Sequence, residues 1–135
     1  MKVREIITEG LKRDEATKII SRFIKFAQQE LELDELPSIN LITDYHYSVK
    51  HRSFGGYSPN DKSINVMMLN RHIQDLLRTL AHELVHYRQD LNDELNADSG
   101  NDGSPQENEA NSTAAVIMRK WGKLNPDIFS LPPIS

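Results

Sequence analysis

Apolar residues recur at helical spacing near the start of the chain. Between Asp14 and Leu33 they follow the i, i+3, i+4 pattern of one helix face, at Ala16, Ile19, Ile20, Phe23, Ala27 and Leu31. Pro37 ends this segment, because proline disfavours helix at the residue before it. We therefore predict a helix over about 14–33, preceded by a short arm over residues 1–12.

The next stretch, residues 38–69, favours strands. SINLITDY at 38–45 and SINVMML at 63–69 are rich in β-branched and apolar residues. SFGGYSP at 53–59 precedes the second of these, with Asn60-Asp61-Lys62 between them as a turn. The three segments predict a small three-stranded sheet. SFGGYSP suits an edge strand, since its glycines leave the backbone approachable.

Two further helices are predicted in the second half of the chain. Asn70 is a suitable N-cap for a helix that runs to about Asp90. The acidic segment LNDELNADSGNDG at 91–103 follows as a loop. Ser104 then opens a last helix that runs to about Trp121 and stops at Gly122. The tail LNPDIFSLPPIS, with three prolines, is predicted to be extended or disordered.

The predicted order is an N-terminal helix, a small sheet and two more helices, which indicates an α+β fold in a single domain over residues 1–135. The net charge of -4 argues against a nucleic-acid partner, which normally meets a basic face. Neither a long apolar run nor an apolar signal segment is present, so we expect a cytoplasmic protein without a membrane partner.

The chain contains no cysteine. A disulfide framework, a thiol nucleophile and a cysteine-ligated zinc site are therefore excluded. Any metal ion must be held by histidines and carboxylates.

The segment LAHELVHYRQ at 80–89 contains the pattern HExxH, formed by His82, Glu83 and His86. At about 100° per residue, His86 lies about 40° from His82 on the helix, within reach of the same ion. The apolar residues lie between about 120° and 220°, at Ile73, Leu76, Leu77, Leu80, Leu84, Tyr87 and Leu91. The two histidines are thus not predicted to be core residues. A solvated polar face stays open as the alternative to a metal site.

A catalytic zinc site needs a third protein ligand. ENEAN at 107–111 offers Glu107 at the start of the last helix. This residue has two interpretations. It is either the third ligand or the N3 glutamate of a capping box that begins at Ser104.

HELVH followed by Glu107-Asn-Glu-Ala110 and by Asn111 resembles the gluzincin metallopeptidases. The resemblance covers residues 38–121 and is closest to the minigluzincins, with SprT-like and ImmA/IrrE-type proteins more distant. It implies a zincin-like fold with one zinc ion, Glu107 as third ligand and Asn111 as support for a ligand histidine. Arg88, Val85 and the lack of cysteines depart from one or another of these groups and concern the subfamily.

The expected function is a zinc-dependent metallopeptidase that hydrolyses peptide bonds of a peptide or protein substrate. A zinc-activated water attacks the bond, with Glu83 as general base. An oxyanion-stabilising side chain is also expected, and the candidates are Tyr45, His46, Tyr47, His51 and Tyr57. The SFGGYSP strand either holds substrate by strand addition or is an ordinary hairpin strand.

Two alternatives stay open. The first keeps the zinc without turnover, as a binding or regulatory module or a latent zymogen. The second is a metal-free interaction domain with a fortuitous HExxH.

Overall fold

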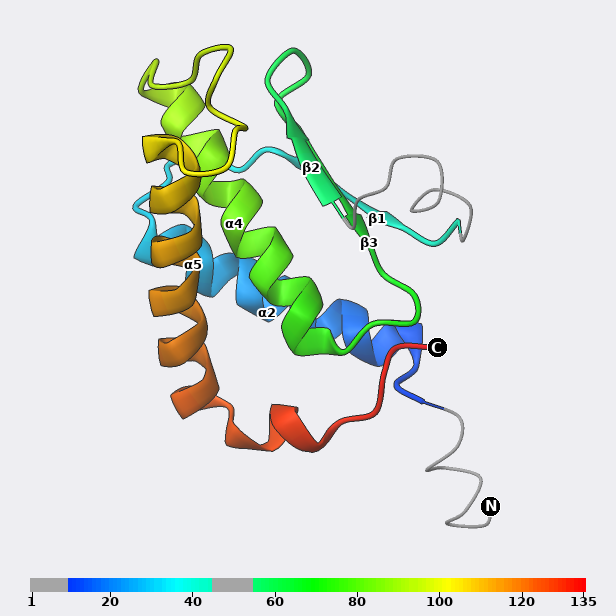
Figure 1. The fold of residues 1–135 in the computed structure, drawn as a ribbon. Helices are drawn as coiled ribbons and strands as arrows, with labels where there is room; N and C mark the ends of the chain where they lie inside the picture. The colour runs from blue at the N-terminus through cyan, green and yellow to red at the C-terminus, as the bar shows by residue number, and fades with distance from the viewer. Residues whose placement is uncertain (1–9, 45–54) are drawn as a thin grey trace, which may run out of the picture.

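Three α-helices and a three-stranded sheet form the described part of the chain, residues 10–44 and 55–135, in a computed structural model (Figure 1). In chain order they are α2 (Arg13–Glu30), β1 (Ser38–Ile42), β2 (Gly55–Ser58), β3 (Ser63–Met67), α4 (Ile73–Leu91) and α5 (Pro105–Leu124), followed by the 3-10 helix η1 (Pro126–Ser130). The predicted α+β class with a small three-stranded sheet is confirmed. Over the described residues, no helix is both long and apolar enough to cross a membrane.

The sheet is mixed, with strand order β1-β3-β2. β1 runs parallel to β3, with Ser38 opposite Ser63, and β2 runs antiparallel to β3, with Tyr57 opposite Ile64. Ile64 and Val66 of the central strand are fully buried, as expected for alternate residues on the covered face. Among the described residues, the GGYS part of SFGGYSP, Gly55–Ser58, thus forms an edge strand, as predicted, and a turn over residues 59–62 connects it to β3.

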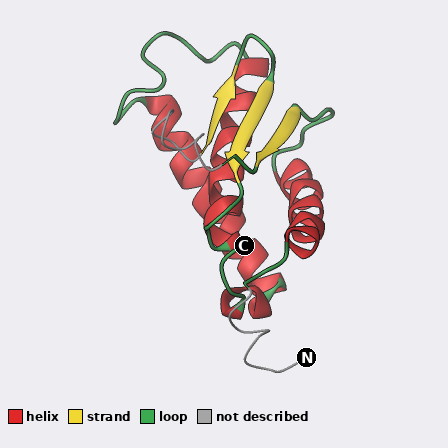
Figure 2. Cartoon of the chain, turned by 90° about the vertical axis from the view of Figure 1, so that its right-hand side faces the viewer, coloured by secondary structure: helices red, strands yellow, loops and turns green. Residues whose placement is uncertain are grey.

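β2 lies directly against helix α4, and Gly55 makes this approach possible. A Cβ atom at Gly55 would lie 2.8 Å from Thr79 Cγ2 of α4 and 2.9 Å from the carbonyl oxygen of Asn65. No such crowding exists at Gly56, where a Cβ would meet nothing within 4 Å. The side view shows the three strands side by side next to the helices (Figure 2).

Helix α4 is central to the core. Its predicted apolar stripe is buried from Ile73 to Tyr87, whereas Leu91, at the end of that stripe, is 47% exposed. α2 and α5 pack beside it and meet through aromatic rings. The Phe23 and Trp121 rings form an edge-to-face pair with centroids 5.1 Å apart. The burial of Ala16, Ile20, Phe23 and Ala27 confirms the predicted inner face of the first helix.

Two helix boundaries differ from the prediction. His72, not Asn70, is the N-cap of α4, and its Nδ1 accepts a hydrogen bond from the Gln74 backbone N–H at 3.1 Å. Asn70 instead adopts a positive φ of 59° and donates its N–H to the carbonyl of Ile134. α2 ends at Glu30 rather than near Leu33, because Glu32 has a positive φ of 54°, which a helix does not allow.

The C-terminal segment also differs. α5 continues through Gly122 to Leu124, and the absent side chain of Gly122 makes room for the Phe129 ring, which lies 3.0 Å from where a Cβ would be. The prediction of an extended or disordered tail is wrong over Pro126–Ser130, which form η1. Ile134 is 1% exposed, forms a parallel bridge with Leu11 and donates its N–H to the carbonyl of Arg71. Long-range contacts that no local pattern encodes therefore order this tail.

Candidate metal centre

His82 and His86 lie one helical turn apart on α4, with their rings in an edge-to-face arrangement. Their Nε2 atoms are 3.1 Å apart and their ring centroids 4.8 Å apart. Only 18% of the His82 side chain and 12% of the His86 side chain are exposed. The face that they occupy is therefore covered by neighbouring residues and is not a solvated polar face.

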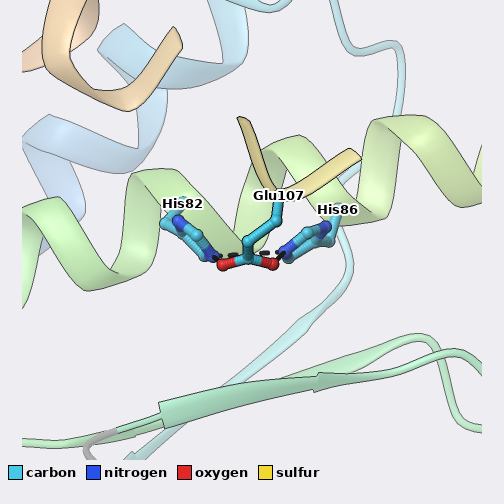
Figure 3. A group of neighbouring side chains, drawn as sticks. All are labelled: His82, His86 and Glu107. Atoms are coloured by element: carbon cyan, nitrogen blue, oxygen red, sulfur yellow. Dashed lines mark hydrogen bonds and ion pairs between the residues drawn. The ribbon is translucent and has the colours of Figure 1, made fainter. Parts of the chain in front are cut away.

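Glu107 reaches this pair from the first turn of α5. Its Oε1 lies 2.8 Å from His82 Nε2, and its Oε2 lies 3.1 Å from His86 Nε2. Figure 3 shows the carboxylate between the two imidazole rings. The structure thus brings together the three side chains that the sequence proposes as ligands.

The capping box predicted at the start of α5 is only half formed. Ser104 Oγ accepts a hydrogen bond from the Glu107 backbone N–H at 3.0 Å, as an N-cap serine does. The Ser104 backbone N–H, however, donates to the carbonyl of Asn101 rather than to Glu107. The Glu107 carboxylate is therefore not occupied in capping and lies at the histidines.

The three side chains are close enough together to bind a metal ion, since their ligand atoms all lie within 4.8 Å of one another. Ligand atoms about 2.05 Å from a tetrahedral metal ion would be about 3.3 Å apart. The observed separations of 2.8 Å and 3.1 Å are close to this value. The residues present therefore fit a metal ion with two nitrogen ligands and one oxygen ligand.

Burial lowers the pKa of His82, although the neighbouring Glu107 carboxylate opposes the shift. The neutral imidazole is thereby favoured, and this is the form that binds metals. A hydrogen bond with the Asn111 side chain also acts on His82. Asn111 thus lies beside a histidine of the group, as the gluzincin resemblance implies.

His86 has a partner that the sequence reasoning missed. Its Nδ1 lies 2.8 Å from Oε1 of Gln89, which is 1% exposed. Gln89 Nε2 in turn donates to the carbonyl of Gln106 at 3.0 Å and to Glu109 Oε1 at 2.9 Å. The sequence feature that could have indicated this contact is the i, i+3 spacing of His86 and Gln89, which makes them neighbours on a helix.

Glu83 lies beside the three-residue group rather than within it. Burial is the main cause that raises its pKa to about 7, against the opposing charge of His86. Its carboxylate also interacts with the Tyr57 backbone N–H of the edge strand β2. A positive ion bound at the histidines would lower this pKa again.

A hollow of about 220 Å³ opens next to Glu83 and His86. The rest of its lining comes from the end of β2 and the turn after it, and from the loop between α4 and α5. These lining residues are Tyr57, Pro59, Leu95, Asn96, Ser99 and Gly100. The loop wall is tied to α5, because Ser104 Oγ donates to the carbonyl of Ser99 at 2.7 Å. The same Ser104 caps the helix that carries Glu107.

Most of the oxyanion candidates, namely Tyr45, His46, Tyr47 and His51, lie outside the described residues. Tyr57 lines the hollow, but its hydroxyl donates to Asp90 Oδ2 at 2.5 Å. Burial, followed by this carboxylate, raises the pKa of the Tyr57 hydroxyl. The Tyr57 hydroxyl is therefore engaged at Asp90, and its backbone is the part that meets Glu83.

No protein-family model, curated protein or solved structure matches this chain. The described residues define an α+β fold that carries a compact His82-His86-Glu107 group able to hold a metal ion.

Proposed function

We propose that this chain is a zinc-dependent metallopeptidase of the gluzincin type with a zincin-like fold. His82, His86 and Glu107 are the zinc ligands, and Glu83 is the general base. The observation that carries the proposal is the position of the Glu107 carboxylate, which lies against both Nε2 atoms. A glutamate that served only in a capping box would direct its carboxylate to the Ser104 backbone N–H and not to the histidines.

The donor set favours zinc among the common metal ions. Two imidazole nitrogens and one carboxylate are the ligands of many catalytic zinc sites, whereas Mg²⁺ and Ca²⁺ prefer oxygen ligands. Three protein ligands also leave a fourth position open for substrate or water. When bound in such a site, zinc polarises a carbonyl group and lowers the pKa of water to about 7.

Glu83 has the surroundings that a general base and acid needs. It lines the same hollow as His86, so its carboxyl group can reach a molecule bound there. Burial raises the pKa of Glu83, and a bound metal ion would lower it again, so the side chain would be ionised near neutral pH and able to accept a proton. Glu83 would thus accept a proton from the attacking water and deliver it to the leaving amine.

A peptide fits the surroundings of the site. The hollow of about 220 Å³ is smaller than the 300–1,000 Å³ of typical small-molecule sites, so it suits one side chain rather than a whole ligand. The edge strand β2 borders it, and an edge strand can hold an extended peptide backbone by strand addition. These features support a peptide or protein substrate.

The test begins with the metal content of the purified protein and continues with cleavage of a quenched-fluorescence peptide mixture. We expect about one zinc ion per chain. Glu83→Gln should retain zinc but lose cleavage by about 100-fold or more, because general acid–base catalysis contributes about 10²–10⁴-fold. Glu15→Gln, an exposed position on α2, is the matched control and should behave as wild type.

Three results would count against the proposal. Wild-type protein without bound metal would exclude the site altogether. Zinc binding without cleavage of any peptide would favour a zinc-stabilised binding module or a latent form. Cleavage that survives Glu83→Gln unchanged would remove Glu83 as the base.

A further inference from the structure

We propose that Gln89 is a positioning residue that fixes the proton and the orientation of the His86 ring. This inference rests on the proposed metal site but not on peptide hydrolysis. Gln89 is 1% exposed in a helix whose other buried residues are apolar, apart from the tyrosine hydroxyl of Tyr87. Burial of an amide costs free energy unless its polar atoms are hydrogen-bonded, and here all of them have partners.

The partners of the Gln89 amide determine which way it faces. Its Nε2 lies 3.0 Å from the carbonyl oxygen of Gln106 and 2.9 Å from a carboxylate oxygen of Glu109. A carbonyl and an ionised carboxylate can only accept hydrogen bonds. Turning the amide over would place Oε1 against two oxygens and leave both acceptors without a donor. The amide nitrogen must therefore face Gln106 and Glu109.

This orientation places Oε1 of Gln89 2.8 Å from His86 Nδ1. Since Oε1 can only accept, Nδ1 must carry the hydrogen. The neutral ring then has a bare lone pair on Nε2, the atom that faces His82 and Glu107. A metal ion binds this form of the imidazole, so Gln89 prepares His86 as a ligand.

Gln89 also connects the two helices that carry the ligand group. It belongs to α4, as does His86, while Gln106 and Glu109 flank Glu107 on α5. Glu109 accepts a hydrogen bond from the amide nitrogen of Gln89, so its carboxylate helps to hold the amide against His86. The contacts of Gln89 thereby fix the position of the His86 ring relative to the Glu107 carboxylate.

The first measurement is zinc affinity by competition with a chromophoric chelator. Gln89→Leu should raise the Kd for zinc by about 10–100-fold, the usual effect of losing the hydrogen-bond partner of a ligand histidine. Gln28→Leu is the matched control, since Gln28 Nε2 donates to the carbonyl of Leu33 at 3.0 Å, far along the chain from the ligand group. It should lower stability through the same kind of lost bond but leave the zinc Kd unchanged.

The second measurement locates the ring proton of His86 by two-bond ¹H–¹⁵N correlation spectra of metal-free protein. Glu107→Ala is the background, because it removes the carboxylate that competes for a proton on Nε2. In that variant the proton of the neutral ring should reside on Nδ1. Adding Gln89→Leu should move it to Nε2, the form that free imidazole side chains favour in water.

An unchanged zinc Kd in Gln89→Leu, or a ring proton whose position ignores residue 89, would overturn the assignment. Failure of the proposed peptidase would look different. If the protein cleaved no peptide, but the zinc Kd and the position of the ring proton changed as expected, Gln89 would still be a positioning residue. If wild-type protein bound no zinc, the spectra alone would decide whether Gln89 sets the ring proton.

Discussion

Each carboxylate oxygen of Glu107 lies beside one imidazole, while the cap of α5 is supplied by Ser104. We therefore expect Glu107→Gln to lower zinc affinity by more than about 100-fold, beyond the effect of losing an outer partner. The free energy of unfolding of the zinc-free protein should change by less than about 1 kcal/mol, because the Ser104 cap remains. Chelator competition and urea denaturation in the presence of a chelator measure the two effects.

Ser104→Ala is the contrasting variant. It keeps the Glu107 carboxylate but removes the cap, which costs about 0.5–2 kcal/mol of stability. If Glu107→Gln were instead to keep its zinc and lose stability as Ser104→Ala does, Glu107 would be a cap and not a ligand.

Asp90 links the edge strand and its turn to the end of α4. Its Oδ2 accepts hydrogen bonds from the Tyr57 hydroxyl at 2.5 Å and from Lys62 Nζ at 3.0 Å. The Tyr57 hydrogen bond is the main cause that lowers the pKa of Asp90, with Lys62 assisting and burial opposing. A carboxyl group with a lowered folded pKa stabilises the protein when ionised.

The stability that Asp90 contributes should therefore depend on pH. It should be fully present above about pH 5 and be lost as the pH falls through the ordinary aspartate pKa of about 3.9 towards the lower folded value. The measurement is the difference in unfolding free energy between wild type and Asp90→Asn from pH 7 to pH 2.5. Tyr57→Phe should reduce this pH dependence, and a difference that stays constant over the range would contradict the assignment.

At the scale of elements, the contact between β2 and α4 depends on Gly55. A methyl group there would lie 2.8 Å from the Thr79 side chain and 2.9 Å from backbone, so the strand must move away from the helix. We expect Gly55→Ala to destabilise the protein by about 1–3 kcal/mol, as overpacking does. Gly56→Ala, where the methyl group meets nothing within 4 Å, should stay within about 0.5 kcal/mol of wild type.

Urea denaturation of the two alanine variants gives the comparison directly. Equal stabilities would show that β2 is not held closely against α4. The position of Tyr57 N–H at Glu83 depends on the same contact, so cleavage should fall further in Gly55→Ala than in Gly56→Ala.

The elements also show what could be predicted from sequence. Helical periodicity predicted the buried face of α2 and most of the stripe on α4, because both are local consequences of 3.6 residues per turn. The same periodicity placed His82 and His86 on one face. Gln89 was not predicted, since its contacts with Gln106 and Glu109 exist only after α5 packs on α4. The Asn70 cap was wrong because a tertiary hydrogen bond to Ile134 determines the backbone there.

At the scale of the whole molecule, the C-terminal segment returns to the start of α2 and α4. Ile134 is 1% exposed and bridges to Leu11, 123 positions earlier in the printed sequence. Three prolines in the tail indicated extended chain, and no local pattern could show that Ile134 forms a parallel bridge with Leu11. Contacts of this separation are what single-sequence reasoning lacks.

Ile134→Ala should accordingly cost about 2–5 kcal/mol, the usual range for truncating a buried isoleucine. Leu124→Ala is its control, because that side chain is also aliphatic and C-terminal but is 67% exposed, and it should stay within about 0.5 kcal/mol of wild type. Chemical denaturation measures both. Similar small effects would mean that the tail does not contribute to the core.

Ser104 makes two contacts with consequences for how this protein can change. Its Oγ holds the carbonyl of Ser99 in the wall of the hollow and accepts the N–H of Glu107. A substitution at positions 95–100 that reshapes the hollow for another side chain also pulls on the helix start that presents Glu107. In the proposed peptidase, selectivity and metal retention would therefore be linked traits. A lineage of such a peptidase that broadened its substrate range through this loop would be expected to carry compensating changes at Ser104.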